Sequence, residues 1–256
     1  MKIKIEGLGV DYGAHKALDD VSFEGNPGEV ISVIGPNGSG KSTLIKCIAQ
    51  VHRPSRGTVC LNDRDATSMD PNEIARLIGY VPQNFHYLFF STVMETVLLG
   101  RKPHIKWRIS PHDLEVVQDA LDSMNIRAYA GKFMDQLSGG EKQKVYIARA
   151  LAQEPELFLF DEPTSNLDLK HQIEVLEITR KLTKSRGASM IVALHDLNLA
   201  YTYSDAVIVL NKGRIYACGK PVDVLTPATI QAVYGVEAMI VESDFGRHIV
   251  PLKVKT

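Results

Sequence analysis

The sequence predicts an α/β fold: a parallel-sheet core built around a phosphate-binding loop, an N-terminal antiparallel β subdomain and an inserted α-helical subdomain. A glycine-rich loop at 35–43 follows an apolar run and leads into a helical pattern. Continuously apolar stretches at 157–160 and 190–194 are typical of buried parallel strands. Strand patterns give way to helical ones after position 83. These three observations indicate a helical segment inserted into a sheet that carries the loop.

Composition argues against a nucleic-acid-binding protein. The 256 residues suffice for one large domain or a domain with a subdomain, and their formal net charge is −1. Acidic and basic residues are mixed along the chain, whereas a nucleic-acid-binding protein would show a basic excess or stripe. We therefore expect no nucleic acid among the partners.

Three features bear on the compartment. Cys47, Cys60 and Cys218 match no metal spacing, and an odd cysteine count without a disulfide pattern suits a reducing compartment. No apolar run approaches the roughly 18–20 residues of a membrane-spanning helix. The N-terminal residues alternate like a strand and lack the apolar region of a signal peptide. We expect a cytoplasmic protein whose membrane role comes through a partner.

Strands and helices alternate along the first third of the chain. Period-two alternation and apolar runs predict strands at 2–8, 21–24, 30–34, 58–61 and 78–81. Helical patterns cover 41–51 and a short stretch from about Asn72. The strand at 78–81 is ended by Pro82, so Gln83 follows almost directly on a strand end.

The loop at 35–43 has every part of a phosphate-binding loop: a preceding strand, glycines, a lysine, a hydroxyl and a helix. Its residues are Gly35, Pro36, Asn37, Gly38, Ser39, Gly40, Lys41, Ser42 and Thr43. The glycines let backbone N–H groups close around phosphate oxygens, and the helix points its positive end at the same anion. Lys41 would bind the terminal phosphates, and the Ser42 hydroxyl would bind Mg²⁺. A glycine-rich turn that merely caps a helix is the alternative, and the full match favours a nucleotide site.

Residues 84–134 hold helical patterns and little strand signal. Apolar residues recur at helical spacing from Leu114 to Met124, after Ser110–Pro111 as N-cap and first-turn proline. The segment opens with Phe85–Phe90, a stretch dense in aromatic residues. Two interpretations stay open for this stretch: the core of the helical subdomain, or a surface that faces a partner.

A second candidate phosphate contact begins the helix that ends at about Ala152. Ser138 and Glu141 form a capping box, which explains the serine and the glutamate but not Gly139 and Gly140 between them. Glycine within a helix costs up to about 1 kcal/mol relative to alanine. Exposed amides at a helix N-terminus would offset that cost by holding an anion.

Carboxylates and a histidine follow the two apolar stretches. Asp161 and Glu162 come directly after 157–160, and α/β sheets bind ligands at the carboxyl ends of their strands. Asp161 can hold Mg²⁺, while Glu162 can orient or deprotonate a water that attacks the terminal phosphate. His195 follows 190–194 in the same way, which favours a γ-phosphate contact over a purely structural role.

The last part of the chain is less informative. The sequence predicts a helix that includes Val175, Ile178 and Leu182, and strands at 206–210 and 214–218. Positions 221–256 hold short helical and strand signals without recognisable chemistry.

Together these residues resemble the ATP-binding subunit of ATP-binding cassette (ABC) transporters over nearly the whole chain. The matching motifs are the Walker A loop at 35–43, the Q-loop glutamine Gln83, the signature LSGGE at 137–141, Walker B at 157–162, the D-loop at 165–168 and the switch histidine His195. Tyr12 is similar in position to the aromatic residue on which the adenine stacks. The signature is the most specific motif, because other phosphate-loop enzymes lack it.

The resemblance implies a RecA-like core and a division of the chain. The ATPase domain would span 1–235, with the nucleotide-binding core and β subdomain in 1–83 and 157–235. The helical signature subdomain would occupy 84–156, and a C-terminal extension 236–256.

The resemblance also implies ATP and Mg²⁺ as cofactors. The residues implied in catalysis are Glu162, His195, Gln83 and Lys41, and those implied to hold Mg²⁺ are Ser42, Gln83 and Asp161. Nucleotide contacts would come from Tyr12, the loop at 35–43, Ser138, Gly139, Gly140 and Asp168. Two protomers would pair head to tail, so that the signature of one acts on the ATP of the other. ATP would close this dimer, and hydrolysis would open it.

The type of transporter rests on shorter resemblances. Gly100–His104 is similar to a stretch in the ATPases of importers for iron–siderophore complexes, haem and vitamin B12, and so are 164–168 and 195–198. Molybdate and tungstate importers stay open, because the ATPase never touches the cargo. The implied partners are a second ATPase subunit forming a homodimer, permease subunits and, indirectly, a periplasmic or extracellular substrate-binding protein. The implied location is the cytoplasmic face of the membrane.

A soluble cassette ATPase that acts on DNA or the ribosome is the alternative from another class. The neutral charge, the single cassette and the modest helical insertion make it the less favoured one. His86, His104 and His112 are interpreted as surface or subdomain residues rather than metal ligands.

Overall fold

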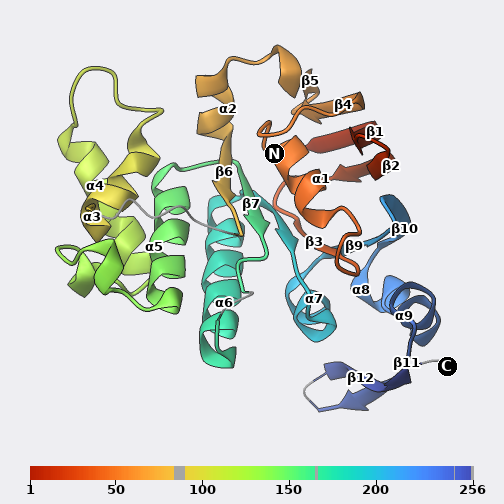
Figure 1. The fold of residues 1–256 in the computed structure, drawn as a ribbon. Helices are drawn as coiled ribbons and strands as arrows, with labels where there is room; N and C mark the ends of the chain where they lie inside the picture. The colour runs from red at the N-terminus through yellow and green to blue at the C-terminus, as the bar shows by residue number, and fades with distance from the viewer. Residues whose placement is uncertain (84–89, 165–166, 245, 255–256) are drawn as a thin grey trace.

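A six-stranded sheet forms the centre of the molecule (Figure 1). The computed structural model describes residues 1–83, 90–164, 167–244 and 246–254. In space the strands follow the order β10 (Arg214–Gly219), β9 (Ala206–Asn211), β3 (Val30–Ile34), β8 (Ser189–Ala193), β7 (Leu157–Asp161) and β6 (Ile78–Val81). Neighbouring strands are parallel except for the antiparallel pair of β10 with β9. The carboxyl ends of β3, β6, β7 and β8 therefore meet at one edge of the sheet.

Both faces of this sheet are covered, which explains why its strands read as continuous apolar runs. On β3, Ile31 and Val33 belong to one buried cluster, while Val30 and Ile34 belong to the other. The first cluster joins the sheet to α1 (Lys41–Ile48) and to the N-terminal strands. The second joins it to the helices of the opposite face.

The predicted antiparallel β subdomain is confirmed. Its strands follow the order β2 (His15–Gly25), β1 (Ile3–Tyr12), β4 (Arg56–Leu61) and β5 (Arg64–Asp65). The first two strands are longer than the predicted 2–8 and 21–24, because register shifts interrupt their alternation and hide the pattern. Helix α1 is shorter than predicted: it ends at Ile48, and Gln50 has a left-handed φ of 56°.

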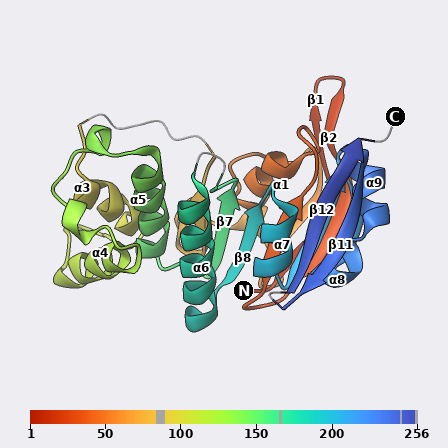
Figure 2. The same cartoon turned by 90° about the horizontal axis from the view of Figure 1, so that it is seen from below.

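The predicted helical insertion forms a lobe at one end of the molecule (Figure 2). The lobe packs against edge strand β6. Its main helices are α3 (Val93–Leu98), α4 (Pro111–Ser123) and α5 (Gly139–Ala152), with single turns η2 (Leu99–Arg101), η3 (Arg127–Tyr129) and η4 (Met134–Gln136). Each main helix begins with a capping box, a hydroxyl residue paired with an acidic residue three positions later. These caps fix where the helices start. None of the described helices is long and apolar enough to cross a membrane.

The remaining elements complete the layers around the sheet. The turn η1 (Ala66–Ser68) and helix α2 (Pro71–Leu77) precede β6, while α6 (Leu169–Arg186), α7 (Leu197–Tyr203), α8 (Pro221–Val224) and α9 (Pro227–Tyr234) follow β7. The last residues form a hairpin, β11 (Val236–Ser243) and β12 (Gly246–Val254). Asn198 of α7 fastens it: Asn198 Nδ2 donates to the Ile249 carbonyl at 3.1 Å, and the Ile249 N–H donates to Asn198 Oδ1 at 2.7 Å.

Candidate nucleotide site

Residues far apart in the sequence surround one cavity of about 450 Å³ at the carboxyl edge of the sheet. The loop after β3, Gln83 after β6, Glu162 after β7 and His195 after β8 all line it. The described residues that line it are Tyr12, His15, Ala17, Asn37, Gly38, Gly40, Lys41, Ser42, Thr43, Gln83, Glu162 and His195. The topology therefore brings together the glycine loop and the strand-end residues that the sequence singled out.

Two glycines of the loop are required by its geometry. Gly35 has φ of 150°, and a Cβ there would lie 2.2 Å from the Leu210 carbonyl oxygen. Gly40 has φ of 106° and caps α1, and a Cβ there would lie 2.6 Å from the Ala17 carbonyl oxygen. Any side chain would clash at both positions, so only glycine allows the loop to pass this close to the Leu210 and Ala17 carbonyl oxygens.

Lys41 places a buried cation at this loop. Its side chain is only 4% exposed, and Nζ donates to the carbonyl oxygens of Gly35 at 2.9 Å and Pro36 at 3.3 Å. Nζ also lies 3.9 Å from Glu162 Oε1. Burial lowers the pKa of Lys41, while the charges of Glu162 and Asp161 oppose that shift. The Lys41 ammonium group is therefore already positioned to bind an anion in the cavity.

Ser42 and Asp161 form a pair of oxygen ligands. Ser42 Oγ donates to Asp161 Oδ1 at 2.7 Å. Burial raises the pKa of Asp161, against the hydrogen bond from Ser42 and the nearby charge of Lys46. A hydroxyl beside a carboxylate is the kind of donor set that Mg²⁺ prefers, so these residues fit the predicted ion.

Glu162 connects the catalytic residues that the sequence predicted. It is 8% exposed and accepts a hydrogen bond from Gln83 Nε2, while His195 Nε2 lies 2.7 Å from its Oε1. Its φ of 53° is unusual for a residue other than glycine. Strained backbone of this kind clusters at functional sites. Three of the four residues predicted for catalysis, Lys41, Gln83 and His195, thus lie around the carboxylate of the fourth, Glu162.

Tyr12 lines the nucleotide cavity and is exposed to solvent. It ends β1, is 48% exposed, and its ring centroid lies 5.2 Å from that of His52. An exposed ring at this position leaves an aromatic surface free for a base, which is compatible with the predicted adenine contact.

The signature residues lie outside this cavity. Ser138 and Gly139 are exposed at the start of α5, and Ser138 and Glu141 form the predicted capping box. A Cβ on Gly139 would meet no atom within 4 Å, and one on Gly140 would meet none closer than 3.5 Å. Nothing within the described protomer requires glycine at either position, so packing does not explain them.

Asp168 also lies outside the cavity. It caps α6, is 66% exposed and accepts hydrogen bonds from the backbone and ring of His171. These contacts explain Asp168 as a helix cap, and its predicted nucleotide role stays a prediction. The neighbouring D-loop positions 165–166 lie outside the described residues.

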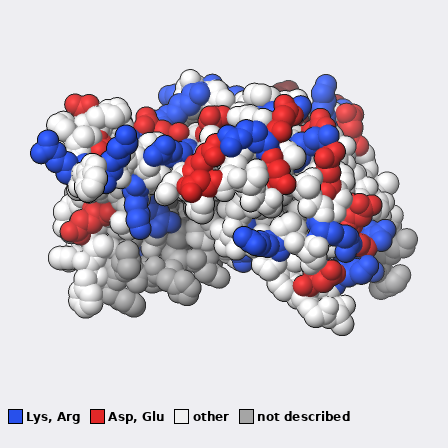
Figure 3. Space-filling model, turned by 90° about the horizontal axis from the view of Figure 1, so that it is seen from above, with Lys and Arg blue, Asp and Glu red and all other residues white. Residues whose placement is uncertain are grey.

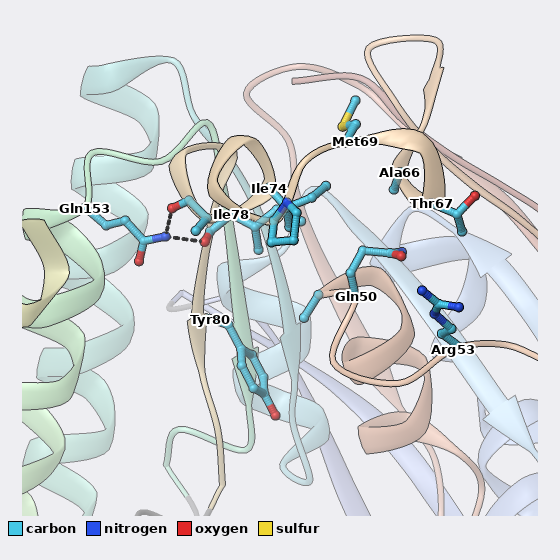
Figure 4. A pocket seen from close by; sticks show the side chains of 12 residues that line it. Gln50, Arg53, Ala66, Thr67, Met69, Ile74, Ile78, Tyr80 and Gln153 are labelled. Atoms are coloured by element: carbon cyan, nitrogen blue, oxygen red, sulfur yellow. Dashed lines mark hydrogen bonds between the residues drawn. The ribbon is translucent and has the colours of Figure 1, made fainter. Parts of the chain in front are cut away.

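A second cavity of about 390 Å³ lies beside α2 and the amino end of β6 (Figure 4), and sequence reasoning missed it. Gln153 reaches it from the helical lobe and donates from Nε2 to the carbonyl oxygens of Ala75 and, at 2.6 Å, Ile78. Tyr80 lines it from β6, and burial together with the charge of Asp161 raises the pKa of Tyr80 to about 12. No sequence motif marks Gln153 as a link between lobe and sheet.

Other expectations concern the surface. Figure 3 looks down on the side of the molecule that carries α2, where acidic and basic side chains are interspersed without a continuous basic stripe. His104 Nε2 lies 2.9 Å from the Gln153 carbonyl oxygen, and the described residues contain no metal-binding cluster.

Of the aromatic stretch 85–90, only Phe90, which is 92% exposed, belongs to the described residues.

Known proteins are similar to this chain in sequence and in fold. The family model described as ABC transporter matches residues 18–165. A hemin import ATP-binding protein of Thermobifida fusca is 41% identical over 234 residues, which are 91% of this chain and 82% of that protein.

Two solved structures match over most of the chain. A chain of a metal-chelate type ABC transporter in an inward-facing conformation gives a TM-score of 0.86 at 32% identity, covering 98% of this chain and 97% of that one. A dimeric ATP-binding cassette bound to ADP and Pi after hydrolysis gives a TM-score of 0.78 at 29% identity, covering 86% of this chain and 98% of that one. With this fold, and with the Walker A loop and strand-end residues gathered at one sheet edge, the chain belongs to the ABC transporter family as an ATP-binding, ATP-hydrolysing cassette.

Proposed function

We propose that this chain is the ATPase subunit of an importer that takes up a metal chelate, such as an iron–siderophore complex, haem or cobalamin. The arrangement of Gln83, Glu162 and His195 beside Lys41 carries the hydrolytic part of the proposal. The cargo class is supported by the hemin import relative and by the match to a metal-chelate type transporter.

Glu162 would activate the water that attacks the terminal phosphate. Its carboxylate is sheltered from solvent, oriented by the Gln83 amide and close to the Lys41 ammonium, which would bind the phosphate under attack. His195 is 45% exposed and would hold a γ-phosphate oxygen from the open side. A positioned base of this kind contributes about 10²–10⁴ in rate. Mg²⁺, held by Ser42, Asp161 and Gln83, would neutralise charge on the phosphates.

Two copies of the chain would complete each site. Ser138 and Gly139 are exposed, and Gly140 is half-buried. All three lie outside the nucleotide cavity, and packing does not require the two glycines. The Ser138 amide already donates to Glu141 Oε2, so a phosphate brought by a second protomer would use the amides of Gly139 and Gly140 at this helix N-terminus. The head-to-tail dimer is also supported by the dimeric cassette among the matching structures.

Strand β6 would connect ATP hydrolysis to the permease. Ile78 and Tyr80 line the second cavity at one end of β6, while Gln83 lines the nucleotide cavity just beyond the other end. A shift of Gln83 with the state of Glu162 would therefore move the wall of the second cavity. Permease subunits would dock beside the second cavity. Through them the chain would be held at the cytoplasmic face of the membrane.

A complementation experiment tests the composite site. Lys41→Ala removes the phosphate cation of one half, and Ser138→Arg blocks the signature of the other half. Each variant alone should be nearly inactive, because both of its sites are damaged. Mixing the two should restore part of the ATPase activity, because a mixed dimer contains one site with both halves intact. A mixture as inactive as its components would contradict the shared site.

The cargo class needs a separate test. The chain would be reconstituted with its permease in vesicles, and uptake of ferric siderophore, haem, cobalamin and molybdate would be compared. ATP-dependent uptake of a chelate is the expected result, and uptake of molybdate alone would overturn the cargo assignment.

A further inference from the structure

The turn η2 packs tightly against its surroundings and so fixes the start of the segment that follows it. Arg101 is 3% exposed, and its guanidinium donates to Asp113 Oδ1 at 3.0 Å, Glu154 Oε2 at 2.8 Å and the Ala152 carbonyl oxygen at 2.8 Å. A Cβ on Gly100 would lie 2.1 Å from the Arg149 carbonyl oxygen, so this glycine allows close packing on α5. These contacts explain the glycine and the arginine at the start of the GRKPH stretch.

Two further contacts link Pro103 and His104 to residues next to the second cavity. Arg76 Nε of α2 donates to the Pro103 carbonyl oxygen at 2.9 Å. His104 Nε2 lies 2.9 Å from the carbonyl oxygen of Gln153, whose side chain lines that cavity. In Figure 1 the connection between α3 and α4 rises at the top left, at the same end of the molecule as α2.

The following residues project away from the protein. We call residues 102–109 the Trp107 loop. Trp107, the single tryptophan of the sequence, is 97% exposed, and Lys106 and Arg108 on either side of it are exposed as well. Ile109 is 46% exposed. A tryptophan whose whole surface is in water gains nothing from packing, so its position needs a different explanation.

The charge of this loop is locally one-sided. No acidic residue occurs between Glu95 and Asp113 in the sequence. Arg101 is neutralised by its partners, but Lys102, Lys106 and Arg108 form no ion pair within the described part of the chain. The loop therefore presents three unpaired cations around the exposed indole, although the wider face is mixed in charge (Figure 3).

An apolar hollow of about 370 Å³ adjoins the loop. It is lined by Leu98, Leu99, Ile105 and Ile109, with Lys102 and Glu95 at its rim. The Glu95 carboxylate is occupied by hydrogen bonds from the backbone and hydroxyl of Thr92. Aliphatic surface, indole and basic groups thus lie together at the end of one anchored segment.

We propose that the Trp107 loop contacts the anionic lipid surface of the membrane. Tryptophan prefers the headgroup level of a bilayer, and lysine and arginine beside it are attracted to lipid phosphates. A protein-binding surface is less favoured by this composition, because lysine is depleted at protein interfaces while two of the three cations of this loop, Lys102 and Lys106, are lysines. The loop would add a direct lipid contact to the attachment that the permease provides.

Tryptophan fluorescence reports on this contact directly, since Trp107 has no other indole to obscure it. The full-length chain would be titrated with vesicles of phosphatidylglycerol and phosphatidylcholine in equal parts, and with vesicles of phosphatidylcholine alone. The expected result is a blue shift and co-sedimentation with the anionic vesicles, reduced at about 0.5 M salt by screening. No shift with the anionic vesicles at low salt would overturn the proposal.

Charge variants separate the loop from the rest of the surface. Each basic side chain near an anionic surface strengthens binding about fivefold, so Lys106→Glu with Arg108→Glu should weaken vesicle binding about twentyfold or more. Lys181→Glu with Lys220→Glu changes the net charge equally at exposed positions elsewhere and should weaken it much less. Equal losses in the two double variants would contradict a specific loop contact.

The assay is independent of the proposed transport function, because it needs neither nucleotide nor permease. Both double variants should keep the ATPase activity of the parent chain, which verifies that they fold. Trp107→Ala should lower co-sedimentation in the same way as the loop charge variants. A blue shift that arises only after permease subunits are added would overturn the lipid contact in favour of a protein partner.

Discussion

His195 Nε2 lies 2.7 Å from Glu162 Oε1, so two side chains from the ends of neighbouring parallel strands share one contact. The strands β7 and β8 pair through Asp161 and Ala193, so Glu162 lies one residue and His195 two residues beyond the last paired position. Glu162 is buried while the His195 side chain is 45% exposed. The histidine therefore joins the sheltered carboxylate to the open side of the nucleotide cavity.

Replacing the carboxylate should separate ATP binding from hydrolysis. Glu162→Gln keeps the shape of the side chain but removes the base, so we expect turnover to fall about a hundredfold or more while ATP binding persists. The ATP-bound dimer should then accumulate and elute earlier on gel filtration with Mg-ATP. A variant that stays monomeric under saturating Mg-ATP would count against Glu162 as the catalytic base and against the ATP-bound dimer.

Loss of the buried cation should abolish nucleotide binding. Lys41→Ala removes an ammonium group that is held inside the cavity and would bind the terminal phosphates. Binding of a fluorescent ATP analogue should weaken by at least tenfold, measured by anisotropy. Lys2→Ala, which removes an exposed cation paired with Asp63, is the control and should bind normally. Equal affinity in the two variants would refute the role of Lys41.

Two glycine variants should respond in opposite ways. Gly139→Ala meets open space in the first turn of α5, so the free energy of unfolding should stay the same or rise by up to about 1 kcal/mol. Its ATPase activity should nevertheless fall if a partner's nucleotide binds there. Gly35→Ala places a Cβ against the Leu210 carbonyl and should destabilise the fold by about 1–3 kcal/mol. Thermal unfolding and ATPase assays distinguish these effects, and full activity in Gly139→Ala would leave the glycine without a role.

Sequence alone predicted the parts of the site whose chemistry is local. Gly35, Lys41 and Ser42 lie within one loop, and the buried strand before Glu162 reads as an apolar run because both faces of the sheet are covered. His195 was expected at the end of a strand beside that of Asp161 and Glu162, and β7 and β8 are indeed neighbours. Its direct contact with Glu162 was not predicted.

Contacts made across the fold left no pattern in the sequence. Gln153 is the C-cap residue directly after α5, and its side chain donates to carbonyl oxygens of α2 and β6. This contact depends on tertiary packing alone. The hairpin β11–β12 was missed because its strands are mostly exposed and pair locally. Asn198, which fastens β12, resembles any polar helix residue until the fold brings Ile249 beside it.

Acid should weaken the helical lobe through Asp113. Hydrogen bonds from the Ser110 hydroxyl and backbone, and the charge of Arg101, lower the pKa of Asp113 from 3.8 to about 2. The folded protein therefore binds fewer protons at this group than the unfolded chain between about pH 4 and pH 2. The carboxylate stabilises the fold above this range, and its contribution is lost as the pH falls through it.

The variant Asp113→Asn isolates this contribution. It removes one partner of the buried Arg101, so the free energy of unfolding at neutral pH should fall by about 3 kcal/mol. Urea unfolding from pH 6 down to pH 3 should show a smaller acid-dependent loss in the variant than in the parent chain, because the titrating group is gone. Asp122→Asn, at an exposed ion pair with Arg127, is the matched control and should retain the parent's pH dependence. Parallel pH profiles for the parent and Asp113→Asn would mean that Asp113 does not hold its depressed pKa in the folded lobe.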